Sequence, residues 1–392
     1  MIGAIIGDIA GSIYEFNNIK TEDFPLIGEN CFFTDDTVMT IAVAEALQNG
    51  NRNEKKTETC MVKSIKKYGK LYPNAGYGGR FSAWLQNPEP KPYNSYGNGS
   101  AMRVSPVAWY FHSLEKVEKF AEISARVTHD HPEGIRGAQA VAAAIFMARN
   151  GRSKEYIKRY MELKYHYEFS TTLDEIRPDY HFDETCQGTV PVALEVFFEA
   201  ESFEDTLRKA ISMGGDSDTL AAIACSVAEA FYPVPEEIQK LALSHLDKKL
   251  TSMLKKWNED ISVSSSSFEH RDLLLYTDFL LSNPHTEKKT LRHPSMDTDI
   301  VVPEYSEKMY NFIQDAIASP YFREDYKEIL SRHDIRRYED MIVELPYAGE
   351  NLLSAMLTLI LSGEKVNPGN IAWAAETGIL GDILQGLKEC KE

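Results

Sequence analysis

Apolar residues recur at steps of three and four along most of the first 260 residues, which is the period of an α-helix. Several of these segments are apolar on nearly all sides, as expected for helices in the interior of a bundle. Strand-like alternation of apolar and polar residues is scarce. The pattern predicts an all-α fold with many short helices and functional loops between them. The clearest predicted helices are Val38–Leu47, Glu118–Thr128, Ile135–Arg149, Pro191–Glu199, Phe203–Met213 and Thr219–Phe231.

The helical pattern is interrupted in the last third of the chain. Ser262–Ser267 is low in complexity, Asn283–Pro303 holds three prolines, and Phe268–Leu281 between them is predicted to be one more helix. Helical patterning then resumes in the segments Tyr305–Ala318, Glu324–Leu330, Leu352–Leu361 and Ile371–Leu387. We expect three regions: a main domain over residues 1–260, a linker region with one helix over 261–303, and a small C-terminal helical domain over 304–392.

Composition and charge narrow the range of partners. The 392 residues carry a net charge of −17, and such a surface repels nucleic-acid backbones and anionic lipid, so general nucleic-acid or membrane binding is not expected. Five scattered cysteines without CxxC spacing argue against a disulfide framework. The N-terminus lacks the features of a signal peptide, and no apolar run approaches the length of a membrane span. We therefore expect a cytoplasmic protein.

Two short acidic motifs each stand directly before an apolar helix. They are Thr34-Asp35-Asp36-Thr37 and Gly214-Gly215-Asp216-Ser217-Asp218-Thr219. The simplest interpretation of each is a helix N-cap, because Asp and Thr oxygens accept the free N–H groups of a first turn. A cap needs one acidic residue, however, whereas each motif supplies two acids together with hydroxyls.

If the two motifs converge, their four carboxylates favour a cation. The carboxylates would repel one another strongly in a low-dielectric interior, and a cation would neutralise them. Hard oxygen ligands from Asp and Thr suit Mg²⁺ or Mn²⁺, and their number suits two ions. The positive dipole end of each helix opposes a cation, so the surplus of carboxylates has to overcome it. Together the motifs favour a metal site over two caps.

Two glycine-containing loops offer weaker signals. The segment Gly97–Arg103 (GNGSAMR) can present backbone N–H groups to a phosphate, although most such loops are only turns. In Thr128–Gly134 (THDHPEG), Pro132 suits the first position of a helix, so Asp130 or His131 can be its cap. The two histidines can instead bind metal or phosphate, but their spacing fits no standard zinc site.

The first sixteen residues combine glycines with acids. Glycines at positions 3, 7 and 11 of an apolar helix permit close packing against another helix. Asp8 and Glu15 are seven residues apart and are expected near one another around that helix. Polar residues on an apolar helix need partners if they are buried.

Taken in their order along the chain, these five segments resemble the ADP-ribosylglycohydrolase family. The resemblance extends from about Met1 to Asp260. It implies the all-α fold of that family, a helical bundle with a binuclear Mg²⁺ or Mn²⁺ centre. By motif position it implies that Glu15 gates the site or assists the attacking water, that Asn98, Gly99 and Ser100 surround the diphosphate and distal ribose, and that His131 contacts ADP-ribose. The metal ligands it implies are Thr34, Asp35, Asp36, Asp216, Asp218 and Thr219.

The sequence therefore predicts a metal-dependent hydrolase that cleaves the glycosidic bond between ADP-ribose and an acceptor, with Glu15, Asp35 and Asp36 as catalytic residues. Two alternatives stay open. One is a catalytically silent ADP-ribose-binding or structural protein on the same fold, and the other is a different binuclear-metal hydrolase such as a phosphodiesterase. The expected partner is an ADP-ribosylated substrate. The acceptor, the oligomeric state and the role of the C-terminal domain are not predicted.

Overall fold

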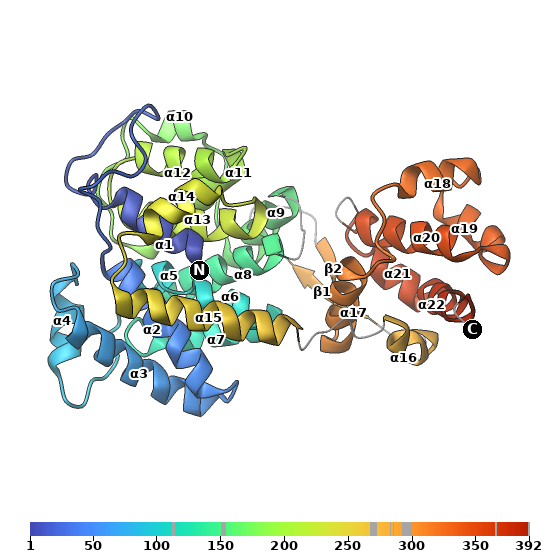
Figure 1. The fold of residues 1–392 in the computed structure, drawn as a ribbon, viewed down its shortest axis with the longest axis horizontal. Coiled ribbons are helices and arrows are strands. Elements are labelled where there is room, and N and C mark those ends of the chain that lie inside the picture. Colours follow the sequence, from blue (N-terminus) through green and yellow to red (C-terminus); the bar gives the residue numbers. More distant parts are fainter. Residues whose placement is uncertain are drawn as a thin grey trace. The chain divides into compact units, whose positions relative to one another are not determined.

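The computed structural model describes residues 1–111, 114–149, 154–266, 273–282, 284, 286–291, 300–364 and 367–390. The chain divides into two compact units, Met1–Ile261 and Ser262–Glu392, and each has its own hydrophobic core. The described part is helical almost throughout, which confirms the predicted all-α fold (Figure 1).

The first unit is a bundle of helices of very different lengths. The longer ones are α1 (Ile2–Gly11), α2 (Asp35–Gly50), α3 (Glu54–Leu71), α7 (Leu114–Arg126), α8 (Pro132–Arg149), α9 (Lys154–Tyr165), α11 (Cys186–Glu199), α12 (Phe203–Ser212), α13 (Ser217–Phe231) and α15 (Lys248–Ser266). The shorter ones are α4 (Gly79–Gln86), α5 (Gly99–Met102), α6 (Ser105–Tyr110), α10 (Leu173–Ile176) and α14 (Glu236–Leu243).

Helix α13 lies at the centre of this unit and packs against α1, α8, α11 and α12 (Figure 1). It is buried on every side from Ser217 to Ala228, as its nearly continuous apolar sequence predicts. Helix α1 lies so close to α13 that a Cβ atom at Gly7 would be 2.3 Å from the carbonyl oxygen of Ala221. The predicted close packing of α1 through its glycines is confirmed, and it brings the ends of α1 and α13 together.

All six helices predicted in the first unit are present, with their ends displaced by a few residues. The additional long helices, α3, α9 and α15, carry many charged residues on their outer sides and therefore lack a strongly apolar composition. Two details differ from expectation. Helix α1 ends at Gly11, so Glu15 lies in the turn after it rather than on one helix with Asp8. Helix α15 continues through the serine run to Ser266.

The second unit contains a short hairpin and several helices. Strand β1 (Glu287–Leu291) pairs antiparallel with β2 (Ile300–Glu304), with Lys289 opposite Val302. These strands lie in and next to the region predicted as a linker with one helix, and the sequence pattern did not indicate them. The remaining elements are η1 (Leu273–Tyr276), α16 (Thr277–Leu281), α17 (Glu307–Ala318), α18 (Tyr326–Arg332), α19 (Tyr338–Glu344), η2 (Leu345–Tyr347), α20 (Glu350–Gly363), α21 (Asn370–Glu376) and α22 (Ile379–Glu389).

Two predicted helices of this unit differ in detail. The segment Ile371–Leu387 is two helices, because Gly378 takes a left-handed conformation (φ +83°) that ends one and starts the next. Of Phe268–Leu281, the first five residues lie outside the described residues and the rest forms η1 and α16. Leu273 and Leu280 of this segment belong to the core of the second unit. Among the described residues, no helix has both the length and the apolarity that crossing a bilayer requires.

Candidate metal and ligand site

A cavity of about 520 Å³ opens where α1, α2, α5 and α13 meet. Its walls come from residues far apart in the sequence, which only the packing of these helices brings together. The lining segments are the turn after α1 (15–16), the start of α2 and the residues before it (32–36), the α3–α4 loop and first residues of α4 (74–76 and 78–81), the loop before α5 (93 and 95–98), α5 and the residue after it (99, 102 and 103), residue 129, residues 182 and 184–185, and the start of α13 (216, 218 and 219).

The first acidic motif forms the start of α2, and its capping is shared with Asp8. Thr34 is the N-cap residue, and its hydroxyl oxygen accepts from the N–H of Asp36. The buried carboxylate of Asp8 accepts from the N–H groups of Thr34 (3.0 Å) and Thr37 (3.1 Å) and from the Thr34 hydroxyl (2.6 Å). Asp8 therefore takes up the positive end of α2, so the carboxylates of Asp35 and Asp36 are not needed as caps.

The second acidic motif forms a strained turn before α13. Gly214 and Gly215 both have positive φ angles (66° and 68°), a conformation that other residues rarely adopt. The amide of Asn18 bonds Gly215 on both sides, donating to its carbonyl oxygen at 3.0 Å and accepting from its N–H at 2.8 Å. Asp216 is the N-cap residue of α13 but makes no capping bond through its side chain. Its Oδ2 instead accepts from the side-chain amide of Asn98 at 2.6 Å.

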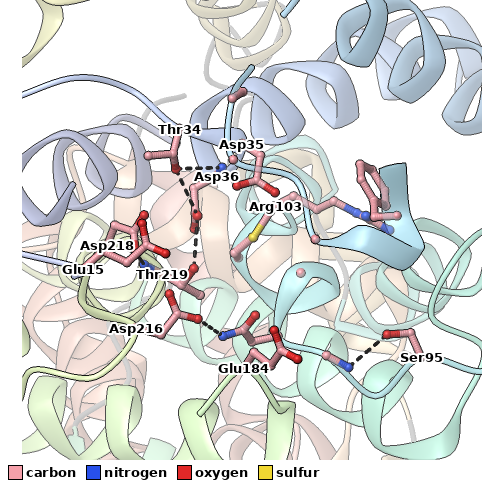
Figure 2. A pocket seen from close by; sticks show the side chains of 18 of the residues that line it. Glu15, Thr34, Asp35, Asp36, Ser95, Arg103, Glu184, Asp216, Asp218 and Thr219 are labelled. Atoms are coloured by element: carbon pink, nitrogen blue, oxygen red, sulfur yellow. Dashed lines mark hydrogen bonds between the residues drawn. The ribbon is translucent and has the colours of Figure 1, made fainter. Parts of the chain in front are cut away.

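The two motifs converge, and their acids face a common space (Figure 2). The Thr219 hydroxyl donates to Oδ2 of Asp36 at 3.1 Å and so joins α13 to α2. Carboxylate oxygens lie within 4.8 Å of one another in two groups that share Asp218. The first group is Asp8, Asp36 and Asp218, and the second is Glu15, Asp216 and Asp218.

The electrostatics of these acids fit a cation. Burial, and then the neighbouring carboxylates, raise the pKa of Asp36 and of Asp218 well above the ordinary value. The same causes raise the pKa of the partly exposed Asp35 to about 8. Oδ1 of Asp36 is buried and has no hydrogen-bond partner. An unpartnered oxygen among crowded carboxylates is the donor set that a hard divalent cation prefers.

Glu15 lies at the edge of the acidic cluster. It belongs to the turn after α1, which Asn18 closes by donating to the carbonyl oxygens of Tyr14 (2.8 Å) and Glu15 (2.9 Å). Its carboxyl group is half-buried and lies near Asp216 and Asp218. Burial, followed by the charges of Asp216 and Asp8, raises the pKa of Glu15 to about 7. A carboxyl group with such a pKa is suited to accept and return a proton near neutral pH.

The loop before α5 reaches the cavity, but its three candidate residues have different surroundings. Gly99 lines the cavity. Asn98 also lines it, although its amide is engaged with Asp216 and with the hydroxyl of Thr189 (3.1 Å). The side chain of Ser100 is fully buried and donates to the carbonyl oxygen of Gly134 at 2.7 Å. Ser100, unlike its two neighbours, is not among the residues that line the cavity.

The two histidines of the THDHPEG segment have different surroundings, and only one of them lines the cavity. His131 is not among the residues that line the cavity, and its Nδ1 accepts from the N–H of Glu133 at 3.1 Å in the first turn of α8. His129 lines the cavity and is buried. Its Nε2 faces the loop before α5, since a Cβ atom at Gly99 would lie 3.3 Å from it. The geometry favours His129 over His131 as the histidine that meets a ligand.

The sequence did not predict the roles of two parts of the site. Asp8, which lies behind the cavity wall, is predicted from the sequence only to need a partner if it is buried. The α3–α4 loop holds Gly76, Gly78 and Gly79, and no atom lies within 4 Å of where a Cβ of Gly78 or Gly79 would be. The cluster AGYGGR at positions 75–80 was the available signal, and it followed a surface helix that the apolar pattern did not mark. Phe32 and Phe33, bulky residues directly before the first acidic motif that the sequence suggested as part of the pocket wall, do line the cavity.

Comparisons with known proteins concern mainly the first unit. Residues 1–262 match the family model described as ADP-ribosylglycohydrolase. The human protein named ADP-ribosylhydrolase ARH3 is 28% identical over 320 residues, which is 61% of this chain and 87% of that protein. ADP-ribosylarginine hydrolase Tri1 of Pseudomonas putida is 25% identical over 65% of this chain and 76% of its own length. ADP-ribosyl-[dinitrogen reductase] glycohydrolase of Rhodospirillum rubrum is 28% identical over 41% of this chain and 54% of its own length.

Proposed function

The chain belongs to the ADP-ribosylglycohydrolase family, and on this premise we propose that it is a metal-dependent hydrolase that cleaves the glycosidic bond between ADP-ribose and an acceptor. One observation carries the proposal. Asp36 of α2, Asp216 and Asp218 at the start of α13, and Glu15 after α1 meet in one cavity large enough for a nucleotide-sized ligand. A scaffold without activity has no use for buried acids that repel one another.

We propose that two divalent cations, Mg²⁺ or Mn²⁺, bind among these acids. Such cations, when bound, would stabilise the charge of the transition state and help to orient the ribose. Asp216 and Asp218 on one side and Asp35 and Asp36 on the other are the candidate carboxylate ligands, and Thr34 and Thr219 offer hydroxyl oxygens. Asp8 holds the start of α2 through its hydrogen bonds to the N–H groups of Thr34 and Thr37, and this keeps Asp36 directed into the cluster. Asn98 does the same for Asp216.

The reaction needs a general base beside the anomeric carbon. The glycosidic bond breaks through a transition state with oxocarbenium character, and a water oxygen bonds to the anomeric carbon. The leaving atom of the acceptor keeps the bonding electron pair and takes up the proton that the water gives up. Glu15 is half-buried and next to the acidic cluster, so its carboxylate is placed to orient the water and take its proton. Asp35, which is also partly exposed on the cavity wall, is placed to orient the ribose.

The other end of the cavity suits the diphosphate. Gly78 and Gly79 present open backbone at the start of α4, and Gly99, beside the imidazole of His129, lines the cavity at the start of α5. Arg80 and Arg103 add positive charge to the same wall. Backbone N–H groups and guanidinium groups are the usual partners of phosphate. We propose that the diphosphate lies between these two loops, with the ribose to be cleaved directed towards Asp35 and Glu15.

The test is the release of free ADP-ribose from a panel of substrates linked through arginine, serine or a nucleobase, with Mg²⁺, Mn²⁺ or EDTA. Metal-dependent release from one substrate would support the proposal and identify the acceptor. AMP as the product would show phosphoester cleavage instead. Tight binding of ADP-ribose without any turnover would show a silent binding protein. The relative named as an ADP-ribosylarginine hydrolase makes the arginine-linked substrate the first to test.

A further inference from the structure

One side-chain amide fastens the turn after α1 to the turn before α13. In the first of these, residues 12–18 (the Glu15 turn), Nδ2 of Asn18 donates to the carbonyl oxygens of Tyr14 at 2.8 Å and Glu15 at 2.9 Å. The same amide bonds Gly215 of the second, the glycine turn Gly214–Gly215, through a donated bond of 3.0 Å and an accepted bond of 2.8 Å. Three carbonyl oxygens face the nitrogen and one N–H group faces the oxygen, so these partners fix the orientation of the amide. A carboxylate of the same shape cannot make this set of bonds, because it has no N–H group to donate.

The two turns carry acids that the proposed reaction uses. The glycine turn leads directly into Asp216 and Asp218, whose carboxylate oxygens lie within 4.8 Å of those of Glu15 (Figure 2). The turns approach one another closely, since a Cβ atom at Gly214 would lie 3.2 Å from Cβ of Asn18. Asn18 therefore joins the turn of the proposed general base to the turn of two proposed cation ligands, although it is 197 positions away from Gly215.

The glycine turn has further supports. Oδ2 of Asp216 accepts from the amide of Asn98 at 2.6 Å, and α13 is buried from Ser217 onward. Directly before the turn, the carbonyl oxygen of Met213 accepts from Nζ of Lys20 at 2.6 Å. The glycine turn and its acids are therefore expected to keep their place if Asn18 is lost.

The Glu15 turn has no such further supports. Residues 16–18 are exposed. Among the residues that the structure describes, Asn18 is the only one whose side chain bonds the backbone of residues 15–17, and the Glu15 carboxylate bonds no protein group. The position of this carboxylate thus follows that of an exposed turn. Loss of Asn18 should displace Glu15 while the cation ligands stay where they are.

We propose that Asn18 is a positioning residue, which holds the carboxylate of Glu15 beside the cation ligands by fastening the Glu15 turn to the glycine turn. The inference rests on the proposed function for the role of Glu15 as general base. Asn18 does not line the cavity, so it acts on the reaction through Glu15 alone. Its effect therefore differs from that of Asn98, which supports a cation ligand.

The first test compares Asn18→Asp with Asn17→Asp in the full-length protein. Asn18→Asp keeps the shape of the side chain but turns an oxygen towards three carbonyl oxygens. Asn17→Asp adds the same charge one position earlier, at an exposed residue whose side chain makes no hydrogen bond in the described part of the chain.

With the substrate that the release assay identifies, we expect kcat of Asn18→Asp to fall about 10- to 100-fold, as for a displaced general base. KM and the Mg²⁺ concentration for half-maximal activity should stay within about threefold of wild type, because the cation ligands keep their place. Asn17→Asp should match wild type. A kcat of Asn18→Asp equal to that of Asn17→Asp would overturn the proposal, and so would a loss confined to the Mg²⁺ requirement. A loss of kcat that accompanies an equal loss of folded protein would show a structural role instead.

The second test needs neither substrate nor cation. In the ligand-free protein the N–H group of Gly215 donates to Oδ1 of Asn18, so Asn18→Leu should make this amide exchange with solvent about tenfold faster or more. Asn17→Leu is the control and should exchange as wild type does. Hydrogen exchange followed by NMR measures both. Equal exchange at Gly215 in Asn18→Leu and wild type would show that the two turns are not fastened in solution.

Failure of the inference differs from failure of the proposed function. Wild-type protein that releases ADP-ribose, with Asn18→Asp as active as its control, contradicts the positioning role alone. Wild-type protein that releases no ADP-ribose from any substrate contradicts the proposed function, and with it the role given to Glu15. The exchange at Gly215 decides in either case whether Asn18 fastens the two turns.

Discussion

At the scale of single residues, the five acids of the cluster divide by what their oxygens already bond. Asp8 accepts three hydrogen bonds from the start of α2, so its carboxylate already has its partners within the protein. Asp36 has one oxygen bonded to Thr219 and one without a partner. The difference separates a carboxylate that builds the site from one that is available to a cation.

The substitution Asp36→Asn should therefore separate stability from activity. It removes one of several repelling charges, so we expect the metal-free protein to unfold at a slightly higher temperature than wild type. It also removes a proposed cation ligand, so the stabilisation by Mg²⁺ and the metal-dependent release of ADP-ribose should both be lost. The measurement is thermal unfolding with Mg²⁺ or EDTA beside the release assay. Asp382→Asn, on the exposed side of α22, is the matched control, and wild-type activity in Asp36→Asn would contradict the assignment.

Asn98 is expected to act through Asp216 rather than through the substrate. Its amide donates to Oδ2 of Asp216 at 2.6 Å, and partners of this kind typically change metal affinity about 10- to 100-fold. Asn98→Ala should raise the Mg²⁺ concentration required for half-maximal activity by about that factor. At saturating Mg²⁺ the activity should largely return. Loss of activity that no Mg²⁺ concentration restores would show instead that Asn98 contacts the substrate.

At the scale of elements, the contact between α1 and α13 sets the position of the cation ligands. A Cβ atom at Gly11 would lie 2.5 Å from Cα of Asp218, and one at Gly7 would lie 2.3 Å from the carbonyl oxygen of Ala221. Such separations are shorter than any real contact, so the two helices would have to move apart. The glycines of α1 thus hold the start of α13, and with it Asp218, beside the start of α2.

We predict that Gly11→Ala costs about 1–3 kcal/mol of the free energy of unfolding, as overpacking in a buried contact usually does. It should also weaken the activation by Mg²⁺, because Asp218 is displaced. Gly28→Ala is the control, since nothing lies within 4 Å of the added methyl group, and it should stay within about 0.5 kcal/mol of wild type. Denaturant unfolding and a Mg²⁺ titration give the two values. A Gly11→Ala protein as stable as wild type would show that the helices can separate freely.

At the scale of the whole molecule, the acidic cluster links stability to pH and to cations. The pKa of Glu15 is raised from 4.5 to about 7 and that of Asp35 from 3.8 to about 8. Folding therefore favours their protonated forms. This contribution to stability is complete below about pH 4 and is lost as the pH rises through 7 and 8.

We accordingly expect Mg²⁺ to stabilise the protein more at pH 8 than at pH 5. At pH 8 the acids of the folded protein are ionised at a cost that a bound cation offsets, whereas at pH 5 protons already neutralise them and compete with the cation. The measurement is the increase in melting temperature with Mg²⁺ over EDTA at each pH, with Ca²⁺-free buffers. An increase that is equal or larger at pH 5 would contradict the raised pKa values.

The two separate cores lead to a prediction about truncation. Leu250, Leu254 and Trp257 of α15 belong to the first core, so a chain cut after Ser266 keeps that core complete. We expect residues 1–266 to fold and to keep metal-dependent activity, and residues 1–247, which lack α15, to aggregate or unfold. Circular dichroism and the release assay test both. An inactive but folded 1–266 fragment would show that the second unit takes part in the reaction.

The sequence by itself determined the class of the fold and the two acidic segments of the site. A continuous apolar run such as that of α13 is stable only in the interior of a protein. Two acids before each of two such runs are more than helix capping requires. Both conclusions follow from local composition, because burial and like-charge repulsion depend on residue type. The ordered motifs could likewise be assigned to a family before any contact was known.

Only the tertiary structure decided what each side chain does. It showed that Asp8 caps α2, that Asn98 bonds Asp216, and that His129 rather than His131 lines the cavity. The pairs Asn98–Asp216 and Thr219–Asp36 join residues more than a hundred positions apart. No local pattern encodes such a pair, because the distance between two side chains depends on how their helices pack, and that packing is a property of the whole core.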